Sequence, residues 1–470
     1  MTTTGAEALL PSPRPQGDAS EVPQSSGGGE STSPPASVQR PRLRGVDLAR
    51  GLAVLGMFAA HIGAAPTFLA SDPSTWGGVA HGRSSILFAT LAGVSVALMS
   101  GRTTPPGDED VVAARLRLLV RAVCLFLVGG LVQYLSTPVA VILEFYAVLL
   151  VLCVPLLRWR PRHLFLLAAG IALVLPGLRA LLVAAQGTSS WLGSGGELGT
   201  LAVSGMYPAV VWAAFVVAGL GVGRCDLTAA RVKGALVAVG VALAVVGYGG
   251  SWALTQAFPS IDPMSPASSS AGPSSSGPYP EPQQVPGSEV DLTGFTCMDQ
   301  MDGTYWCADD SGPNALNGPP PGAESDAGAG VPPFTSSLRV SDFLGTAAHS
   351  GATPEVIGSG GVALAVLGTC LALADALGRR RAGGLVAPLV AVGAMPLTAY
   401  CAHLVAIAVV GHLPGGMMAE GEPGWLSGSW QLWALFAGAA LVVCTLWGRF
   451  LGRGPLERLI SWTARRATRA

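Results

Sequence analysis

Residues 44–61 read Arg44-Gly-Val-Asp-Leu-Ala-Arg-Gly-Leu-Ala-Val-Leu-Gly-Met-Phe-Ala-Ala-His61. The stretch is apolar and close to the length that a helix needs to cross a lipid bilayer, yet it carries Asp47, Arg50 and His61. At about 100° per residue, these three side chains share one face of the helix. Ionisable groups are costly inside a bilayer, so the stretch predicts both a membrane-spanning fold and a functional site.

The composition of the whole chain points the same way. Half of its 470 residues are hydrophobic and only 12% are charged, which excludes an ordinary soluble enzyme. The net charge of −1 argues against a nucleic-acid partner. Gly234 follows the single lysine, Lys233, so the sequence contains no ATP-binding P-loop. Metal-binding H-E-x-x-H and C-x-x-C motifs are absent from the sequence as well, and no metal is expected.

Apolar runs near the length of a membrane-spanning helix recur ten times along the chain. They lie near 46–66, 84–100, 118–136, 139–157, 164–184, 204–223, 234–257, 354–377, 385–411 and 428–451. The predicted fold is therefore all-α, a polytopic transmembrane helical bundle of about ten spans. Residues 40–257 would hold spans 1–7, and residues 354–470 would hold spans 8–10 and a basic C-terminus. The polar residues 1–39 are expected to form a disordered cytoplasmic tail and not a cleaved signal peptide.

The arginines predict the orientation of the bundle, because basic residues beside short loops are retained in the cytoplasm. With both termini inside, all but three of the 27 Lys and Arg residues fall on the cytoplasmic side. The three exceptions are Arg83, Arg179 and Arg339. This alternation predicts an N-in, C-in protein of the inner (plasma) membrane.

One large hydrophilic insert, residues 258–353, is then extracytoplasmic. It contains Cys297 and Cys307, which an oxidising compartment would join in a small disulfide ring. A pair of free thiols remains the alternative. We expect the other six cysteines to be small buried apolar residues.

His61 is the first candidate catalytic residue, because imidazole titrates near neutral pH and can act as a general base. Glu144, in the fourth predicted span, lies about 7 Å below the same membrane surface as His61. The matching depth permits a carboxylate–imidazole pair, to which Tyr146 could donate a hydrogen bond. A solitary Glu144 bonded to backbone or water is the alternative. Asp47 and Arg50 could equally be a structural i, i+3 pair at the start of a helix.

The ninth predicted span contains Met395-Pro-Leu-Thr-Ala-Tyr-Cys-Ala-His403. Pro396 removes a backbone donor, and it is predicted to kink the helix and free carbonyl groups toward a cavity. Thr398, Tyr400 and His403 follow it and are candidate substrate-lining residues. The second predicted span carries small residues at four-residue spacing, Ser85, Ala89, Gly93 and Ala97, which is typical of close helix packing.

Several of these motifs resemble known families. The stretch Arg42-Leu-Arg-Gly-Val-Asp-Leu-Ala-Arg-Gly51, the following histidine and Leu87–Ala97 resemble the opening of the heparan-α-glucosaminide N-acetyltransferase catalytic domain. Three further stretches are similar to YeiB-like bacterial membrane proteins. They are Gly205-Met-Tyr-Pro208 with Gly221-Val-Gly-Arg224, Gly393-Ala-Met-Pro-Leu-Thr-Ala-Tyr400, and Gly454-Pro-Leu-Glu-Arg458.

The resemblance implies acyl transfer across the membrane, with acetyl-CoA or another acyl-CoA as the cytosolic donor. The acceptor would be an envelope sugar or lipid on the other side, and membrane lipid would surround the protein. His61 stands where this family has its active-site histidine, and Glu144 would assist it. Arg42, Arg44 and Arg50, with Asp47 beside them, would hold the CoA phosphates through charge-assisted hydrogen bonds.

Two other kinds of function fit the same residues. A proton-coupled transporter or flippase-like carrier would use the intramembrane histidine and glutamate as a proton relay. A non-catalytic envelope scaffold would display the large loop. Dependence on acyl-CoA distinguishes the enzyme from the carrier.

Overall fold

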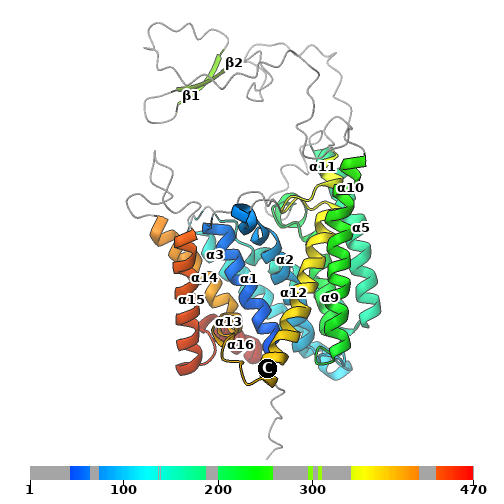
Figure 1. Cartoon of the computed structure of the whole chain (residues 1–470), viewed down its shortest axis with the longest axis vertical. Coiled ribbons are helices and arrows are strands. Elements are labelled where there is room, and N and C mark those ends of the chain that lie inside the picture. Colours follow the sequence, from blue (N-terminus) through cyan, green and yellow to red (C-terminus); the bar gives the residue numbers. More distant parts are fainter. Residues whose placement is uncertain are drawn as a thin grey trace, which may run out of the picture. The chain divides into compact units, whose positions relative to one another are not determined.

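The computed structural model describes residues 43–63, 73–135, 137, 139–186, 199–257, 295–299, 305–309, 340–411 and 430–468. The predicted tail at 1–39 lies outside these residues, as does most of the predicted loop at 258–353. The helices of the described part (Figure 1) belong to one compact unit within Leu43–Ala470.

Ten helical passages follow one another in the described part of the chain, and each corresponds to one of the apolar runs. They are α1 Arg44–Ile62; α2 Arg83–Met99; α3 Asp108–Gln133; α4 Leu143–Cys153, continued by a 3-10 turn, Val154–Arg158; α5 Pro161–Gln186; α8 Ala209–Gly223; α9 Ala230–Ala244, continued through a π turn, Val245–Gly249, into α10 Gly250–Ala257; α12 Thr353–Arg379; α13 Ala387–Ala394 with α14 Pro396–Gly411; and α15 Trp430–Phe450. Shorter pieces are a 3-10 helix, Pro73–Ala80, a π turn, Thr200–Ser204, α11 Ser341–Leu344 and α16 Pro455–Ala467.

Fewer than ten of these passages are spans by length and composition. Within the described residues six helices qualify, or seven if α13 and α14 together form one broken span. The helix α3 carries Asp, Glu and Arg through its first half, and α4 has only 11 residues before it tightens into the 3-10 turn. The helices confirm the predicted all-helical membrane bundle. The number of ten spans and the N-in, C-in topology stay predictions.

The break that Pro396 predicts in the ninth span is confirmed. The helices α13 and α14 meet at Met395 with a bend of 86°. The new N-terminus of α14 is capped from a distance by Glu457 of α16, which accepts hydrogen bonds from the backbone N–H groups of Leu397 (2.8 Å) and Thr398 (3.1 Å). A carboxylate at this position satisfies amides that the proline leaves without helical partners.

Small residues set the closest helix contacts. A Cβ atom at Gly393 of α13 would collide with the carbonyl of Asp47 in α1, and one at Gly51 of α1 would collide with the carbonyl of Leu389 in α13. Each glycine thus lets the backbones of α1 and α13 touch. The stripe predicted on α2 behaves in the same way, since a Cβ at Gly93 would strike the carbonyl of Val216 in α8.

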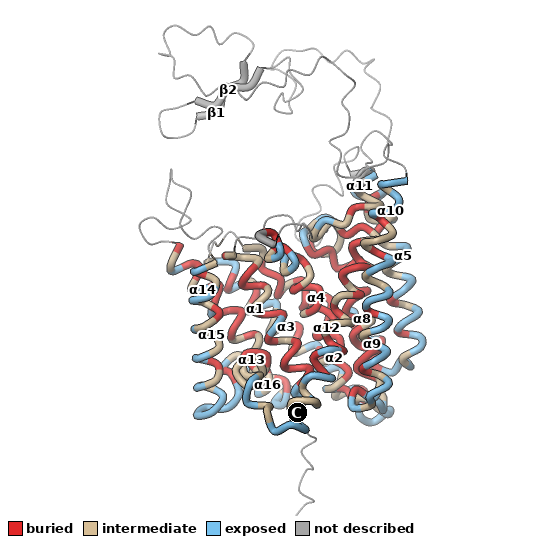
Figure 2. The backbone as a smooth tube through the Cα atoms, in the orientation of Figure 1, coloured by how far each residue is buried: buried red, intermediate tan, exposed pale blue. Residues whose placement is uncertain are grey.

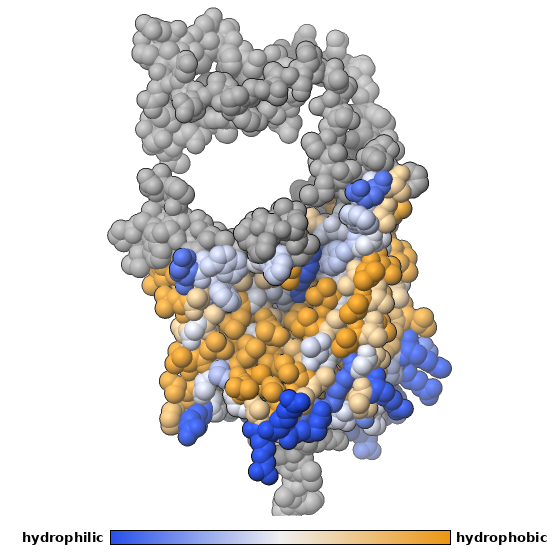
Figure 3. Space-filling view, viewed as in Figure 1, coloured by the Kyte–Doolittle hydropathy of each residue, from blue (hydrophilic) through white to orange (hydrophobic). Residues whose placement is uncertain are grey.

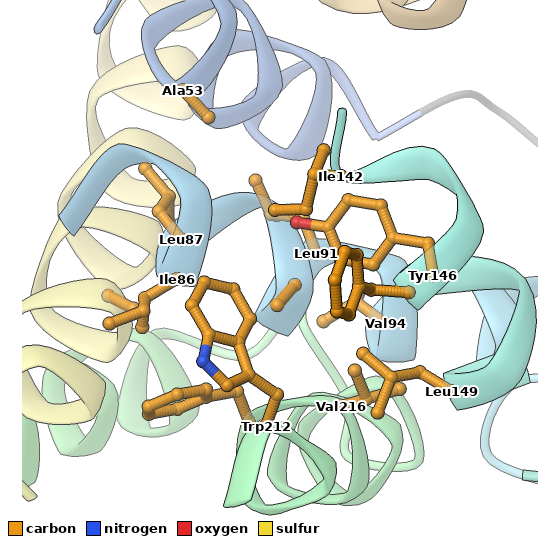
Figure 4. Close-up of a cluster of buried hydrophobic side chains, with 14 of the residues drawn as sticks. Ala53, Ile86, Leu87, Leu91, Val94, Ile142, Tyr146, Leu149, Trp212 and Val216 are labelled. Carbon is orange, nitrogen blue, oxygen red and sulfur yellow. The ribbon is translucent and has the colours of Figure 1, made fainter. Parts of the chain in front are cut away.

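The core of the bundle lies between α1, α2, α4 and α8 (Figure 2). Trp212 and Val216 of α8 pack against Ile86 and Leu91 of α2, with Tyr146 of α4 beside them (Figure 4). Large apolar side chains on α3, α5 and α15 face outward instead. On the face shown in Figure 3, an apolar surface lies between two more hydrophilic rims. A bilayer covers such a surface in a helical membrane protein.

Basic residues gather at one end of the helices, which we call the arginine end. Arg224, after α8, donates to the carbonyls of Ser100, Arg102 and Leu157, so that the ends of α2, α4 and α8 are tied together. Arg158 pairs with Asp108 at 2.5 Å on the same rim. His61, at the last turn of α1, lies at the other end, which we call the histidine end.

Two strands lie within the predicted extracytoplasmic loop. Strand β1, Phe295–Asp299, pairs antiparallel with β2, Tyr305–Asp309, and the register places Cys297 opposite Cys307. Directly opposed residues have the short backbone separation that a disulfide requires. The disulfide itself stays a prediction.

We expect Cys297 and Cys307 in the purified oxidised protein to react with an alkylating reagent only after reduction. Mass spectrometry of the peptide that contains both residues gives the result directly. Cys225, partly exposed near the arginine end, is the control thiol, and it should be alkylated without a reductant. Two free thiols at positions 297 and 307 would refute the ring.

Candidate active site

Two histidines from distant parts of the chain meet near the histidine end. Nδ1 of His61 lies 2.9 Å from Nε2 of His403 in α14. The two ring planes are nearly parallel, with 9° between them and 5.1 Å between centroids, and the ring of Phe58 packs against His403 with 4.2 Å between centroids. Because His403 is almost fully buried, with 3% of its surface exposed, its hydrogen bonds must be made within the protein.

The hydrogen bonds fix which nitrogen of each ring carries the proton. Nδ1 of His403 lies 2.5 Å from the carbonyl oxygen of Tyr400, and a carbonyl can only accept, so this nitrogen is the donor. Nε2 of a neutral His403 is then an acceptor, and Nδ1 of His61 must donate to it. The unprotonated nitrogen of His61 is therefore Nε2. The carbonyl of Tyr400 and the ring of His403 thus leave Nε2 as the nitrogen of His61 that can accept a proton.

His61 lines a cavity of about 190 Å³, which we call the histidine chamber. His81, Tyr207, His349 and Tyr400 contribute to its wall. Two serines that also line it, Ser84 and Ser85, donate to the carbonyls of Ala80 and Gly82. Their hydroxyl hydrogens are thereby occupied, and the imidazoles and phenols are the polar groups that face a molecule in the chamber.

A second cavity, the inner cavity, has a volume of about 330 Å³ and extends toward the arginine end. Arg50 lines it and is held by Asp47 at 2.7 Å and by Ser95 at 2.8 Å. Ile142 and Tyr400 line both cavities, and the backbone N–H of Ile142 donates to the Tyr400 hydroxyl at 3.4 Å. The two cavities are therefore separated by this contact.

A pocket of about 220 Å³ at the arginine end, which we call the arginine pocket, shares Met99, Arg121 and Ser461 with the lining of the inner cavity. Four arginines line it, Arg117 and Arg121 of α3, Arg453 before α16 and Arg465 of α16. Arg121 lines the inner cavity as well. No carboxylate is among the residues lining the arginine pocket, so within the described structure this pocket offers positive charge to an anion.

The structure places the other predicted residues as follows. The side chain of Glu144 lies against Gly129 and Gly130 of α3. Tyr146 donates to the carbonyl of Ser85 at 2.9 Å and lines the inner cavity. Thr398 bonds to Glu457 at 2.5 Å, away from the chamber. The structure shows His403 as a hydrogen-bond partner of His61, and the pairing of His61 with Glu144 stays a prediction.

The predicted donor-binding arginines are also separated from one another. Arg44 donates to the carbonyl of Gly383 at 3.0 Å, on the exposed arginine end, whereas Arg50 lies at the inner cavity. Arg42 lies outside the described residues. The arginine pocket was missed because its members come from α3 and from the chain around α16. The only signal in the sequence was that all of them belong to predicted cytoplasmic segments.

A helical membrane protein with a histidine pair beside two adjoining cavities is the class that this geometry defines. Residues 42–255 match the family described as heparan-alpha-glucosaminide N-acetyltransferase, catalytic, and residues 341–467 match a family described as protein of unknown function (DUF418). Each match covers less than half of the chain, and together they confirm the resemblance predicted from its motifs, to an acetyltransferase catalytic family in the first region and to a YeiB-like family in the second. No curated protein and no solved structure matches it significantly.

The matches show that the site is composite. His61 and Arg50 lie in the region that matches the acetyltransferase, whereas Tyr400, His403 and Arg453 lie in the region of unknown function. The second region therefore completes the histidine pair and the arginine pocket.

Proposed function

We propose that this protein is a transmembrane acyltransferase, which moves an acetyl or other short acyl group from cytosolic acyl-CoA to an envelope sugar or lipid. The observation that carries the proposal is the hydrogen-bond chain from the Tyr400 carbonyl through His403 to His61. It leaves the unprotonated Nε2 of His61 at a chamber next to a cavity that leads to arginines. The match of residues 42–255 to an acetyltransferase catalytic family supports the reaction type.

The donor would enter from the arginine end, which we place in the cytoplasm. Its phosphates would bind at the arginine pocket and near Arg50, through charge-assisted hydrogen bonds. Arg50 and His61 are eleven residues apart on α1, or about 16 Å along its axis. An extended pantetheine arm has a comparable length. The acyl end would therefore reach the chamber by passing between Ile142 and Tyr400.

His61 would act on the acceptor in the chamber. Its Nε2 takes the proton of the acceptor hydroxyl or amine while the acceptor atom bonds to the thioester carbon. His403 accepts the hydrogen bond of the resulting imidazolium and spreads its charge toward the Tyr400 carbonyl. When the carbon–sulfur bond then breaks, the CoA thiolate leaves and takes the proton from His61. The base is thus regenerated with no net change.

A carrier is the second candidate, and the two cavities on either side of the Ile142–Tyr400 contact favour it. In an alternating-access protein the binding site opens to one side of the membrane at a time, and a contact of this kind closes the path to the other side. A carrier of this kind would respond to the proton gradient and would not consume acyl-CoA.

Membrane vesicles separate these functions and test the orientation. Inside-out vesicles expose the arginine end, so labelled acetyl-CoA added outside should pass its label to envelope material in the lumen. Sealed right-side-out vesicles should transfer none until they are made permeable. Transport that requires a proton gradient, without consumption of acetyl-CoA, would favour the carrier and refute the acyltransferase.

A further inference from the structure

A third imidazole of the histidine chamber has no part in the base that His61 and His403 form. It belongs to His349, in the loop between α11 and α12. Its ring is held on three sides, edge-on to Tyr207 at 5.1 Å, parallel to Trp212 at 6.1 Å and edge-on to His81 at 5.9 Å. These contacts fix the plane of the ring, so its polar atoms have set positions in the chamber wall.

The backbone of His349 is strained. Its φ angle is +64°, in the left-handed region that residues with a side chain rarely adopt, and Gly351 follows at +66°. Strain of this kind persists where the surrounding structure imposes it, most often at functional sites. The strain therefore favours a role for His349 beyond packing.

Glu355 imposes this conformation. It lies in the first turn of α12 with 3% of its surface exposed, and it accepts hydrogen bonds from the backbone N–H groups of His349 and Gly351. The hydroxyl of Ser359 also donates to it at 3.4 Å, and Tyr248 bonds to that serine at 2.5 Å. The loop is thus anchored to the N-terminus of a long helix, where a carboxylate is also favoured by the helix dipole.

The proton of the His349 ring can be assigned to one nitrogen. Burial and the neighbouring His81 lower the pKa of His349 to about 4, so the ring is neutral near pH 7 and carries a single N–H. Its Nδ1 is buried without a hydrogen-bond partner. A proton there would bury an N–H donor with nothing to accept it, which is the costlier arrangement. Nε2 therefore carries the hydrogen and is the ring nitrogen available to a molecule in the chamber.

We infer that His349 donates a hydrogen bond from Nε2 to the acyl carbonyl oxygen as negative charge develops on it, opposite the His61 base. The inference rests on the proposed acyl transfer. When the acceptor atom bonds to the carbonyl carbon, the π electrons of the carbonyl move to its oxygen, and a fixed N–H donor stabilises that charge. When the carbon–sulfur bond breaks, the carbonyl re-forms and the thiolate leaves with the proton from His61. Glu355 is a positioning residue for His349.

Two substitutions at His349 separate this role from packing, because both replace the histidine by another residue with a side chain at the same strained backbone position. His349→Phe keeps an aromatic ring against Tyr207 and Trp212 but has no donor, whereas His349→Gln supplies an N–H. We expect His349→Phe to lower the kcat of acyl transfer by about 10²–10³-fold, the range measured for loss of one such donor, with the KM for acyl-CoA changed less than twofold. His349→Gln should recover at least tenfold of this loss. Glu355→Gln should lower kcat and leave the KM for acyl-CoA unchanged.

Wild-type protein and a His163→Phe variant, altered at an exposed histidine of the arginine end, are the reference proteins. Thermal unfolding in detergent checks that each variant is folded. If the wild type transfers acyl groups and His349→Phe has the same kcat as His349→Gln, the inference is wrong while the proposed function stands. A change confined to the KM for the acceptor would also refute it, since that is ground-state binding. If the wild type transfers no acyl group, the proposed function is wrong and the inference with it.

Discussion

His61→Ala is expected to abolish nearly all acyl transfer, with a fall in kcat of about 10²–10⁴-fold, the usual range for loss of a general base. The protein should still fold, because His61 lies at the last turn of α1, where it lines the chamber and is only partly buried. The measurement is transfer of label from acetyl-CoA by purified protein in lipid vesicles. His163→Ala, at an exposed histidine of the arginine end, should be as active as the wild type.

His403→Ala tests the orientation of the base in the same assay. It removes the acceptor that holds the Nδ1 hydrogen of His61, so the His61 proton can move to Nε2 and block the lone pair. We expect kcat to fall substantially, though less than in His61→Ala, with an unchanged KM for acyl-CoA.

Lowering the pH should also reduce transfer by the wild type, because a protonated His61 cannot accept a proton. Wild-type rates in His61→Ala would overturn the assignment of the base.

Loss of the arginine pocket should weaken binding of the acyl donor. A hydrogen bond to a charged group contributes about 1.5–3 kcal/mol, so Arg121→Ala or Arg453→Ala should raise the KM for acetyl-CoA by about tenfold to a hundredfold. The kcat at saturating donor should change little, because these side chains bind phosphates equally well before and during the reaction. Arg380→Ala, at an exposed arginine of the same end, is the matched control and should behave as the wild type.

Acetyl-pantetheine makes this test independent of folding defects. It carries the thioester without the nucleotide phosphates, so its KM should be the same in the wild type and in both pocket variants. If Arg121→Ala and Arg453→Ala raise the KM for acetyl-pantetheine as much as that for acetyl-CoA, the arginine pocket does not bind the phosphates.

The sequence alone determined the parts of this protein that depend on local chemistry. An apolar run forms a helix in a bilayer because its own backbone groups satisfy one another, and every apolar run corresponds to a helix or a broken helix. Pro396 broke the ninth run because proline lacks an N–H, and the small residues of α2 marked a close helix contact. The common face of Asp47, Arg50 and His61 follows from helical geometry, and the salt bridge between Asp47 and Arg50 is present.

The tertiary structure alone decided which side chains meet. Glu144 matches His61 in predicted depth, but depth alone cannot show which side chain His61 meets, and the structure shows His403 beside it. The choice depends on Gly51 and Gly393, which allow α1 and α13 to touch and so deliver the bent helix α14 beside α1. The arginine pocket likewise needs α3 and α16 to pack together, although more than 300 residues separate Arg121 from Arg453 in the chain. Contacts of this kind arise from packing between distant segments, and no local pattern encodes them.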